Sequence, residues 1–314
     1  MPNTTAGNTW NLPNYFGNLF TADSVSTPFL SMIGGLTGGL QTENFEFATD
    51  SLYEHESLAQ KSITETASLT APTAISYVRA QTKNVTQIFH EKVSISYVKM
   101  SNRNRLSGIA TAGASPVVVS EKDFQIARAL EKIAREVEWH FLQGTYAISA
   151  AVGQPNQTRG MIELCAGKST VDGGAAWLSK AIFESLLQEM FNNGALFKNM
   201  VIFCGGVQKT KLSDIYGYAP TDRNVGGVNV KQIETDFGNI AIAKPHRFMP
   251  AATLLIADMS VIAPVSQPVP EKGNFFYEPL SKTGAAEEGQ IFGQMGLDHG
   301  PAFMHGSLTN LKTA

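Results

Sequence analysis

The residues that could do chemistry are spaced in ways that match none of the common catalytic motifs. A phosphate-binding loop is the first candidate, at Gly205-Gly206-Val207-Gln208-Lys209-Thr210. That motif needs Gly directly before Lys-Thr and another Gly five residues earlier, because the backbone must approach the phosphates closely. Gln208 and Phe203 stand at those two positions. The sequence therefore argues against nucleotide binding.

The histidines and carboxylates give no stronger candidate. None of the six histidines forms HExxH or a facial-triad spacing. Asp298, His299 and His305 make a loose cluster, for which surface or interface histidines are favoured over a metal site. The pairs Glu287/Glu288 and Glu136/Glu138 lie in polar contexts, which indicates solvated faces, and no G-x-S-x-G nucleophile motif occurs. We expect no catalytic residue, no cofactor and no metal.

Composition is compatible with a protein that buries much of its surface against neighbours. Hydrophobic residues make up 43% of the 314 residues and charged residues only 16%, below the roughly 25% of an average domain. Large obligate interfaces are poor in charge, although a low-charge monomer fits equally well. The formal net charge of −3 is unlike that of a nucleic-acid reader. No apolar run is long enough to span a membrane, and residues 1–17 do not form a signal peptide.

The two cysteines, Cys165 and Cys204, are far apart in sequence and form no CxxC pair. Both stand beside apolar residues. Buried free thiols are the favoured interpretation, and they suit a reducing cytoplasm.

Two strands separated by a polar segment predict a projecting arm. Residues 43–53 and 85–99 alternate apolar and polar side chains, as strands with one buried face do. About thirty polar residues lie between them, too many for a loop inside a compact domain. We therefore expect a long two-stranded ribbon over residues 42–101, which needs something to lie on because an isolated ribbon is barely stable.

A long amphipathic helix is expected at residues 120–143. Its apolar stripe repeats at helical spacing through Ile126, Leu130, Ile133, Val137 and Phe141, with Arg128, Glu131, Lys132, Arg135 and Glu138 at the other positions. Further helices are expected at about 178–193 and 207–217. Strands are expected at 199–204, 228–235, 240–244 and 254–258.

Residues 1–41 are rich in Asn, Thr, Gly and Ser and carry scattered aromatic residues. Such an arm cannot build a core of its own. Its aromatics pack either on a neighbouring subunit or on the core of their own domain, and the sequence leaves both open.

The order of these elements resembles the Hong Kong 97-type major capsid proteins of tailed bacteriophages. Several local stretches strengthen the resemblance: residues 84–96, residues 129–138 with Phe141-Leu142-Gln143-Gly144, Arg159-Gly160-Met161, Thr235-Asp236-Phe237-Gly238, residues 254–258 and residues 278–284. Ala285 stands where the family often has Asp, and residues 296–300 are looser than the family's usual closing strand. No long helical segment lies ahead of residue 40, which implies the branch without a fused scaffolding domain.

The resemblance implies an α+β fold with five parts. These are an N-terminal arm at 1–41, an extended loop at 42–101, a peripheral domain at 102–174 with its spine helix at 120–143, an axial domain at 175–258, and a return to the peripheral domain at 259–314. Contacts between subunits are expected at Trp10, Phe16, Phe20, Phe45, Phe47, Ile88, Phe89 and Tyr97.

The implied function is a major capsid protein rather than an enzyme. Its copies would gather as hexamers and pentamers into an icosahedral or elongated shell, assembled in the host cytoplasm and ending in the virion, with the N-terminal arm wrapped around a neighbour. Portal, scaffolding and decoration proteins are possible partners. The shell would enclose double-stranded DNA without reading its sequence and without binding a membrane. The alternatives are an encapsulin-like nanocompartment shell and, less favoured, a cytosolic enzyme or ligand-binding protein.

Overall fold

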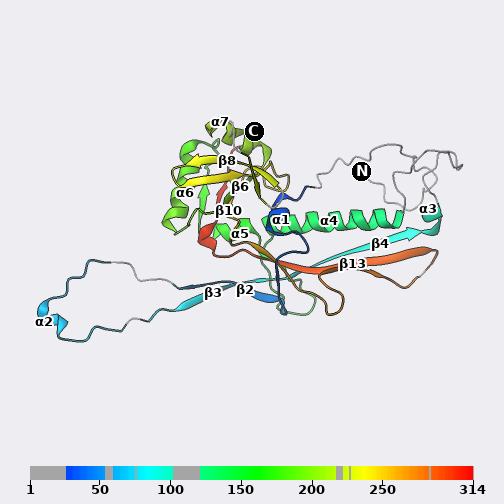
Figure 1. The fold of residues 1–314 in the computed structure, drawn as a ribbon, viewed down its shortest axis with the longest axis horizontal. Helices are drawn as coiled ribbons and strands as arrows, with labels where there is room; N and C mark the ends of the chain where they lie inside the picture. Colours follow the sequence, from blue (N-terminus) through cyan, green and yellow to red (C-terminus); the bar gives the residue numbers. More distant parts are fainter. Residues whose placement is uncertain are drawn as a thin grey trace.

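The computed structural model describes residues 26–53, 59–74, 76–101, 121–216, 222–225, 228–282 and 284–313. A body of sheet and helices lies at the centre (Figure 1). A long helix with paired strands extends from it in one direction, and a narrow two-stranded ribbon extends in the other (Figure 1). This elongated outline gives the chain much more surface outside its core than a compact domain would have.

A seven-stranded sheet forms the body. Its strands run in the order β5 (Thr170–Asp172), β14 (Gly306–Thr309), β10 (Leu254–Asp258), β6 (Met200–Cys204), β9 (Gly238–Ile242), β8 (Val228–Thr235) and β7 (Asp222–Val225). Every residue of β6 and β10 is buried, as expected of central strands that are covered on both faces. The strands predicted at 199–204, 228–235, 240–244 and 254–258 are confirmed.

The two faces of this sheet belong to two apolar cores. Met200, Ile202 and Cys204 pack with α6 (Lys180–Asn192) and α7 (Gly206–Tyr216). Val201 and Phe203, which alternate with them, pack with α1 (Pro28–Ile33), α4 (Glu121–Gln143) and α5 (Met161–Ala166). The strand's period of two divides its side chains between these cores. The helices predicted near 178–193 and 207–217 are confirmed.

A second sheet is built around β13 (Ala286–Asp298), a strand of 13 residues. Along one edge it pairs with β4 (Gln87–Ser96). Along the other it pairs with β12 (Phe275–Pro279) and β11 (Ala263–Ser266), and β1 (Leu40–Gln41) adds to β11. Two short helices adjoin these strands, α3 (Tyr97–Ser101) after β4 and the 3-10 helix η3 (Ala302–Met304) before β14.

Helix α4 lies along β4 and β13 (Figure 1) and confirms the helix predicted at 120–143. Its fully buried residues all lie in its second half, where Ile133, Val137 and Phe141 join the core. Leu130, which was expected on the same buried stripe, is exposed. The first half is held to the sheet by ion pairs, among them Lys122–Glu287 at 3.2 Å. The second half of the helix is thus fully packed in apolar core, whereas the first half is held by partly buried residues, Ile126 and Ala129, and by ion pairs at the surface.

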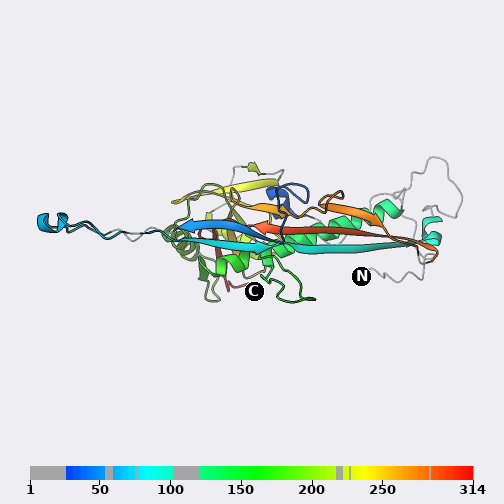
Figure 2. The same cartoon turned by 90° about the horizontal axis from the view of Figure 1, so that it is seen from below.

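The ribbon consists of β2 (Glu46–Tyr53) and β3 (Arg79–Val85), with the short helix α2 (Glu65–Ser68) near its tip. Its tip around α2 stands clear of the body in both views (Figures 1 and 2), whereas the end of β3 at Asn84 and Val85 is buried against the body. The strands are antiparallel, and their register shifts between Ala48 and Asp50. Most residues of both strands and all four residues of α2 are exposed or half-exposed.

The second predicted strand of the arm, at 85–99, needs correction. The chain is divided at Thr86, because β3 pairs with β2 in the ribbon whereas β4 pairs with β13 in the second sheet. The β4 part of the expected arm therefore belongs to the second sheet. The ribbon's second strand is β3, which begins earlier, at Arg79.

Candidate functional site

The described residues contain no candidate metal-binding site. No group of three or more His, Cys, Asp or Glu residues there could hold a metal ion. Within the same residues, no helix combines the length and apolarity needed to cross a membrane. The candidate functional features described below are buried hydrogen-bond networks and exposed apolar side chains.

The cluster of Asp298, His299 and His305 has a structural explanation. Both histidines are fully buried, so the expectation of surface or interface histidines is wrong. The Nε2 of His305 lies 2.7 Å from the carbonyl oxygen of His299, and its Nδ1 lies 3.1 Å from the amide nitrogen of Asp258. An amide N–H can only donate, so Nδ1 accepts and Nε2–H donates. Burial lowers the pKa of His305 to about 4, which keeps this ring neutral.

Glu138 on α4 is the most heavily bonded buried carboxylate among the described residues. It was assigned to a solvated face, and the structure overturns that assignment, because its side chain is completely buried. Its carboxylate accepts hydrogen bonds from the backbone N–H of Phe29 at 3.0 Å and of Leu30 at 2.6 Å. Both amides belong to the first turn of α1, where helical N–H groups have no partner within their own helix. Glu138 therefore caps α1 from a different helix.

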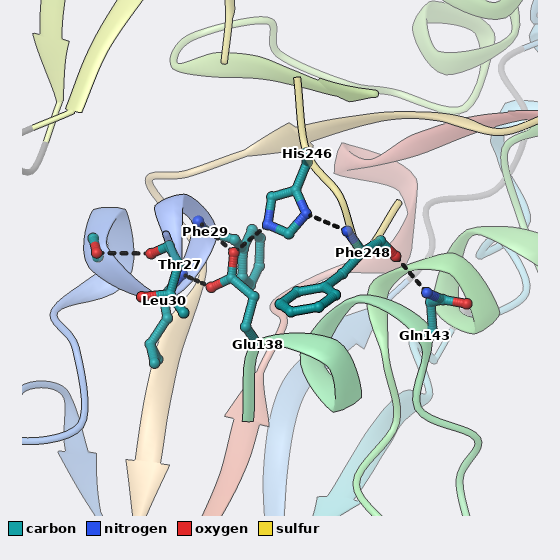
Figure 3. A network of polar contacts seen from close by, with 8 residues as sticks. Thr27, Phe29, Leu30, Glu138, Gln143, His246 and Phe248 are labelled. Carbon is teal, nitrogen blue, oxygen red and sulfur yellow. Dashed lines mark hydrogen bonds and ion pairs between the residues drawn. The ribbon is translucent and has the colours of Figure 1, made fainter. Parts of the chain in front are cut away.

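His246 completes this anchor (Figure 3). Its Nε2 contacts the carboxylate of Glu138, and its Nδ1 accepts the backbone N–H of Phe248 at 3.0 Å. The ring therefore donates through Nε2. The amide of Gln143, also on α4, donates to the carbonyl of Phe248. Three segments distant in sequence, residues 27–30, 138–143 and 246–248, are thus joined in one network, which we call the Glu138 anchor.

The predicted contact residues fall into three groups. Trp10, Phe16 and Phe20 lie outside the described residues. Phe89 is buried in the core of its own chain, and the ring of Phe47 lies against Gly296 of β13. Phe45, Ile88 and Tyr97 are exposed, with Ile88 the most exposed at 60%. Only this last group presents apolar surface outward.

Other exposed apolar side chains gather where α6 ends. Phe191 and Leu196 are each 57% exposed. Beside them Phe197 stacks on Phe237, with ring centroids 5.4 Å apart. Sequence analysis missed this cluster, which we call the α6 patch. Exposed apolar residues that gather in one place indicate an interaction surface more strongly than scattered ones do.

The two thiols are buried and free, as predicted. Burial raises the pKa of both Cys165 and Cys204 to about 12. Because the thiolate is the reactive form, neither cysteine is suited to nucleophilic or redox chemistry.

The family model of the SU10 major capsid protein matches residues 2–312. The chain belongs to the SU10 major capsid protein family. Comparison with curated protein sequences gives no match.

Solved structures show the fold of this family member to be that of the Hong Kong 97-type capsids, as predicted. The chain resembles the capsid of cyanophage A-1(L), with a TM-score of 0.64 at 13% identity over 99% of each chain. It also resembles the capsid of an empty GTA particle, with a TM-score of 0.58 at 12% identity over 97% of each chain. The SrpI encapsulin of Synechococcus elongatus PCC 7942 gives a TM-score of 0.58 at 10% identity over 96% of this chain and 93% of the other.

The family match confirms the predicted function at its coarse level. The chain is a capsid shell protein of the tailed-phage type, a self-assembling structural component of the virion. The encapsulin-like alternative has less support, because that likeness is one of fold alone whereas the family model is that of a capsid protein.

Proposed function

We propose that copies of this chain gather as hexamers and pentamers in the host cytoplasm and close into a shell around double-stranded DNA, without catalysing a reaction. The ribbon of β2 and β3 would lie across an adjacent subunit. One observation carries the proposal: the ribbon leaves the body and buries little of its own surface. Two-stranded ribbons are marginal in water, so it needs a partner surface.

The ribbon has the means to bind without forming fibres. Its outer edges carry unpaired backbone groups that can pair with another chain. Lys83 and Glu46 form an ion pair at 3.0 Å on its surface, and charges on an edge limit uncontrolled pairing. Interlocked arms hold a shell by multivalency, because many modest contacts must break together.

The exposed Phe45, Ile88 and Tyr97 lie on or next to β2 and β4. We place them among the contacts between subunits. The α6 patch, within the segment expected to be the axial domain, would meet its copies around the symmetry axis. Portal, scaffolding and decoration proteins would join the same assembly, and the inner wall would contact DNA without reading its sequence.

The ribbon's tip can be removed without touching its strands. Replacing residues 54–78 by a short Gly-Ser turn keeps β2 and β3 able to pair. We expect a folded, soluble subunit that forms no closed shells by electron microscopy and sedimentation, whereas the charge variant Lys83→Ala still assembles. Normal shells from the tip replacement would refute the proposed role of the ribbon.

A further inference from the structure

A hollow of about 380 Å³ lies on the outer side of α4. It is lined by Lys132, Arg135, Glu136, Trp139, His140 and Phe248. Trp139 is 41% exposed, although a large aromatic side chain usually gains by being covered. The Arg135 guanidinium lies 5.7 Å from the centre of the Phe248 ring. The hollow therefore has aromatic walls and a mainly cationic rim.

The chain enters the described structure close to this hollow. Ser26 is the first described residue, and the first turn of α1 that follows is fixed to Glu138. Trp139 is the next residue along α4, and Phe248 belongs to the Glu138 anchor (Figure 3). Five residues lie between Phe20 and Ser26, and the six steps along the chain span at most about 20 Å when extended. An α-helix with side chains is only about 10–12 Å wide, so residues around Phe20 can reach the hollow.

The composition of residues 1–25 is complementary to it. The segment holds Trp10, Tyr15, Phe16 and Phe20 but no Lys or Arg, and Asp23 is its one charged side chain. Aromatic rings bind favourably to Lys and Arg side chains through their faces and to other aromatics through their edges. A basic segment would be repelled by the cationic rim.

We propose that the aromatic part of residues 1–25 docks into the hollow on α4 of its own chain. Tethering at α1 favours the chain's own segment, because a short tether holds it at an effective concentration in the millimolar range before any neighbour is present. Docking would cover Trp139 and would add contacts to Phe248, which belongs to the Glu138 anchor. The N-terminal segment would then be ordered on the subunit before assembly.

Limited digestion of the full-length, unassembled chain with chymotrypsin tests this proposal, since the protease cuts after exposed aromatic residues. We expect Trp139→Ser to raise the cleavage rate at Trp10–Phe20 about tenfold, equivalent to roughly 1.4 kcal/mol of lost binding. Trp177→Ser is the matched control, because Trp177 is also 41% exposed. Cleavage after Tyr77, on the distant ribbon, gives an internal reference in each digest.

A cysteine pair provides a second measurement that does not remove Trp139. In the variant Phe20→Cys with Glu136→Cys, we expect oxidation to give an intramolecular disulfide, while Phe20→Cys with Lys180→Cys gives none. The native thiols should not interfere, because both are buried. Equal digestion of the Trp139→Ser and Trp177→Ser chains would overturn the proposal, as would a disulfide formed only between two chains.

Discussion

Glu138 should contribute more to the stability of the subunit than any other charged side chain of α4. Its substitution by Ala leaves three buried donors without their acceptor: the amides of Phe29 and Leu30 and the Nε2–H of His246. Each unsatisfied buried donor costs about 1–3 kcal/mol, so three of them would cost several kcal/mol in total. Since waters can enter the space and satisfy one donor, we expect Glu138→Ala to lower the free energy of unfolding by about 4 kcal/mol.

Glu138→Gln tests the chemistry more finely because it keeps the shape. The amide oxygen can still accept two hydrogen bonds, but the amide nitrogen must face a donor. We expect a loss of about 2 kcal/mol, close to one unsatisfied group. Glu136→Ala is the control on the same helix. Glu136 is partly exposed and pairs with Lys132 at 3.6 Å, so its removal should cost at most about 1 kcal/mol.

Urea unfolding of the unassembled subunit measures these differences, provided that sedimentation shows a single species, because assembly would add its own stabilisation. Hydrogen exchange gives the local result. The amides of Phe29 and Leu30 should lose protection in Glu138→Ala before the core of β6 does. Stability of Glu138→Ala within 1 kcal/mol of wild type, with both amides still protected, would refute the role given to this carboxylate.

Three further results are expected. His305 has a pKa near 6.5 in the unfolded chain but about 4 in the folded chain. The stability that this histidine contributes is therefore complete above pH 6.5. It is lost as the pH falls to 4, by up to about 3 kcal/mol. His305→Gln should flatten that slope in unfolding experiments at a series of pH values. Leu196→Asp in the α6 patch should leave the unfolding free energy within about 0.5 kcal/mol yet reduce shell formation in electron microscopy; normal shells would remove this patch from the interface. In hydrogen exchange, raising the salt should accelerate residues 121–131 of α4 more than residues 133–142, since salt screens the exposed ion pairs at the first half; equal acceleration would contradict that division.

The elements of this fold were largely predictable from sequence. Residues 120–143 carry a stripe of apolar side chains at helical spacing, and residues 199–204 form a continuous apolar run. These patterns depend only on residues close together in the sequence, so they can be recognised without knowing which elements pack against each other. The break at Thr86 was not predictable in the same way. β3 and β4 are both alternating strands, and only pairing with β13, about 200 residues away, separates them.

The buried polar groups were harder to predict than the elements. Glu138 lies beside the apolar stripe of α4, where a charge is normally solvated. Its burial follows from three donors supplied by residues 29, 30 and 246, none of which the helix pattern reveals. His299 and His305 likewise take their partners from chain turns that form only in the folded protein. One signal was available in retrospect: Glu138 directly follows Val137 and stands three residues before Phe141, at the edge of the buried face.

Helix α4 joins two kinds of structure with different stiffness. From Ile133 onward it is packed in apolar core and bonded through Glu138 to α1 and to residues 246–248. Before Ile133 it has only partly buried residues, among them Ile126 and Ala129, and ion pairs such as Lys122–Glu287 add to its attachment to the sheet. Each exposed pair contributes about 0.2–1 kcal/mol, far less than burial of a large apolar side chain. A closed shell of the proposed kind places one sequence in five-fold and six-fold surroundings. Bending the first half of α4 would cost less than moving its second half, which would disturb the fully buried core. Adjustment between the two surroundings should therefore occur in the first half, where apolar packing is limited to partly buried residues such as Ile126.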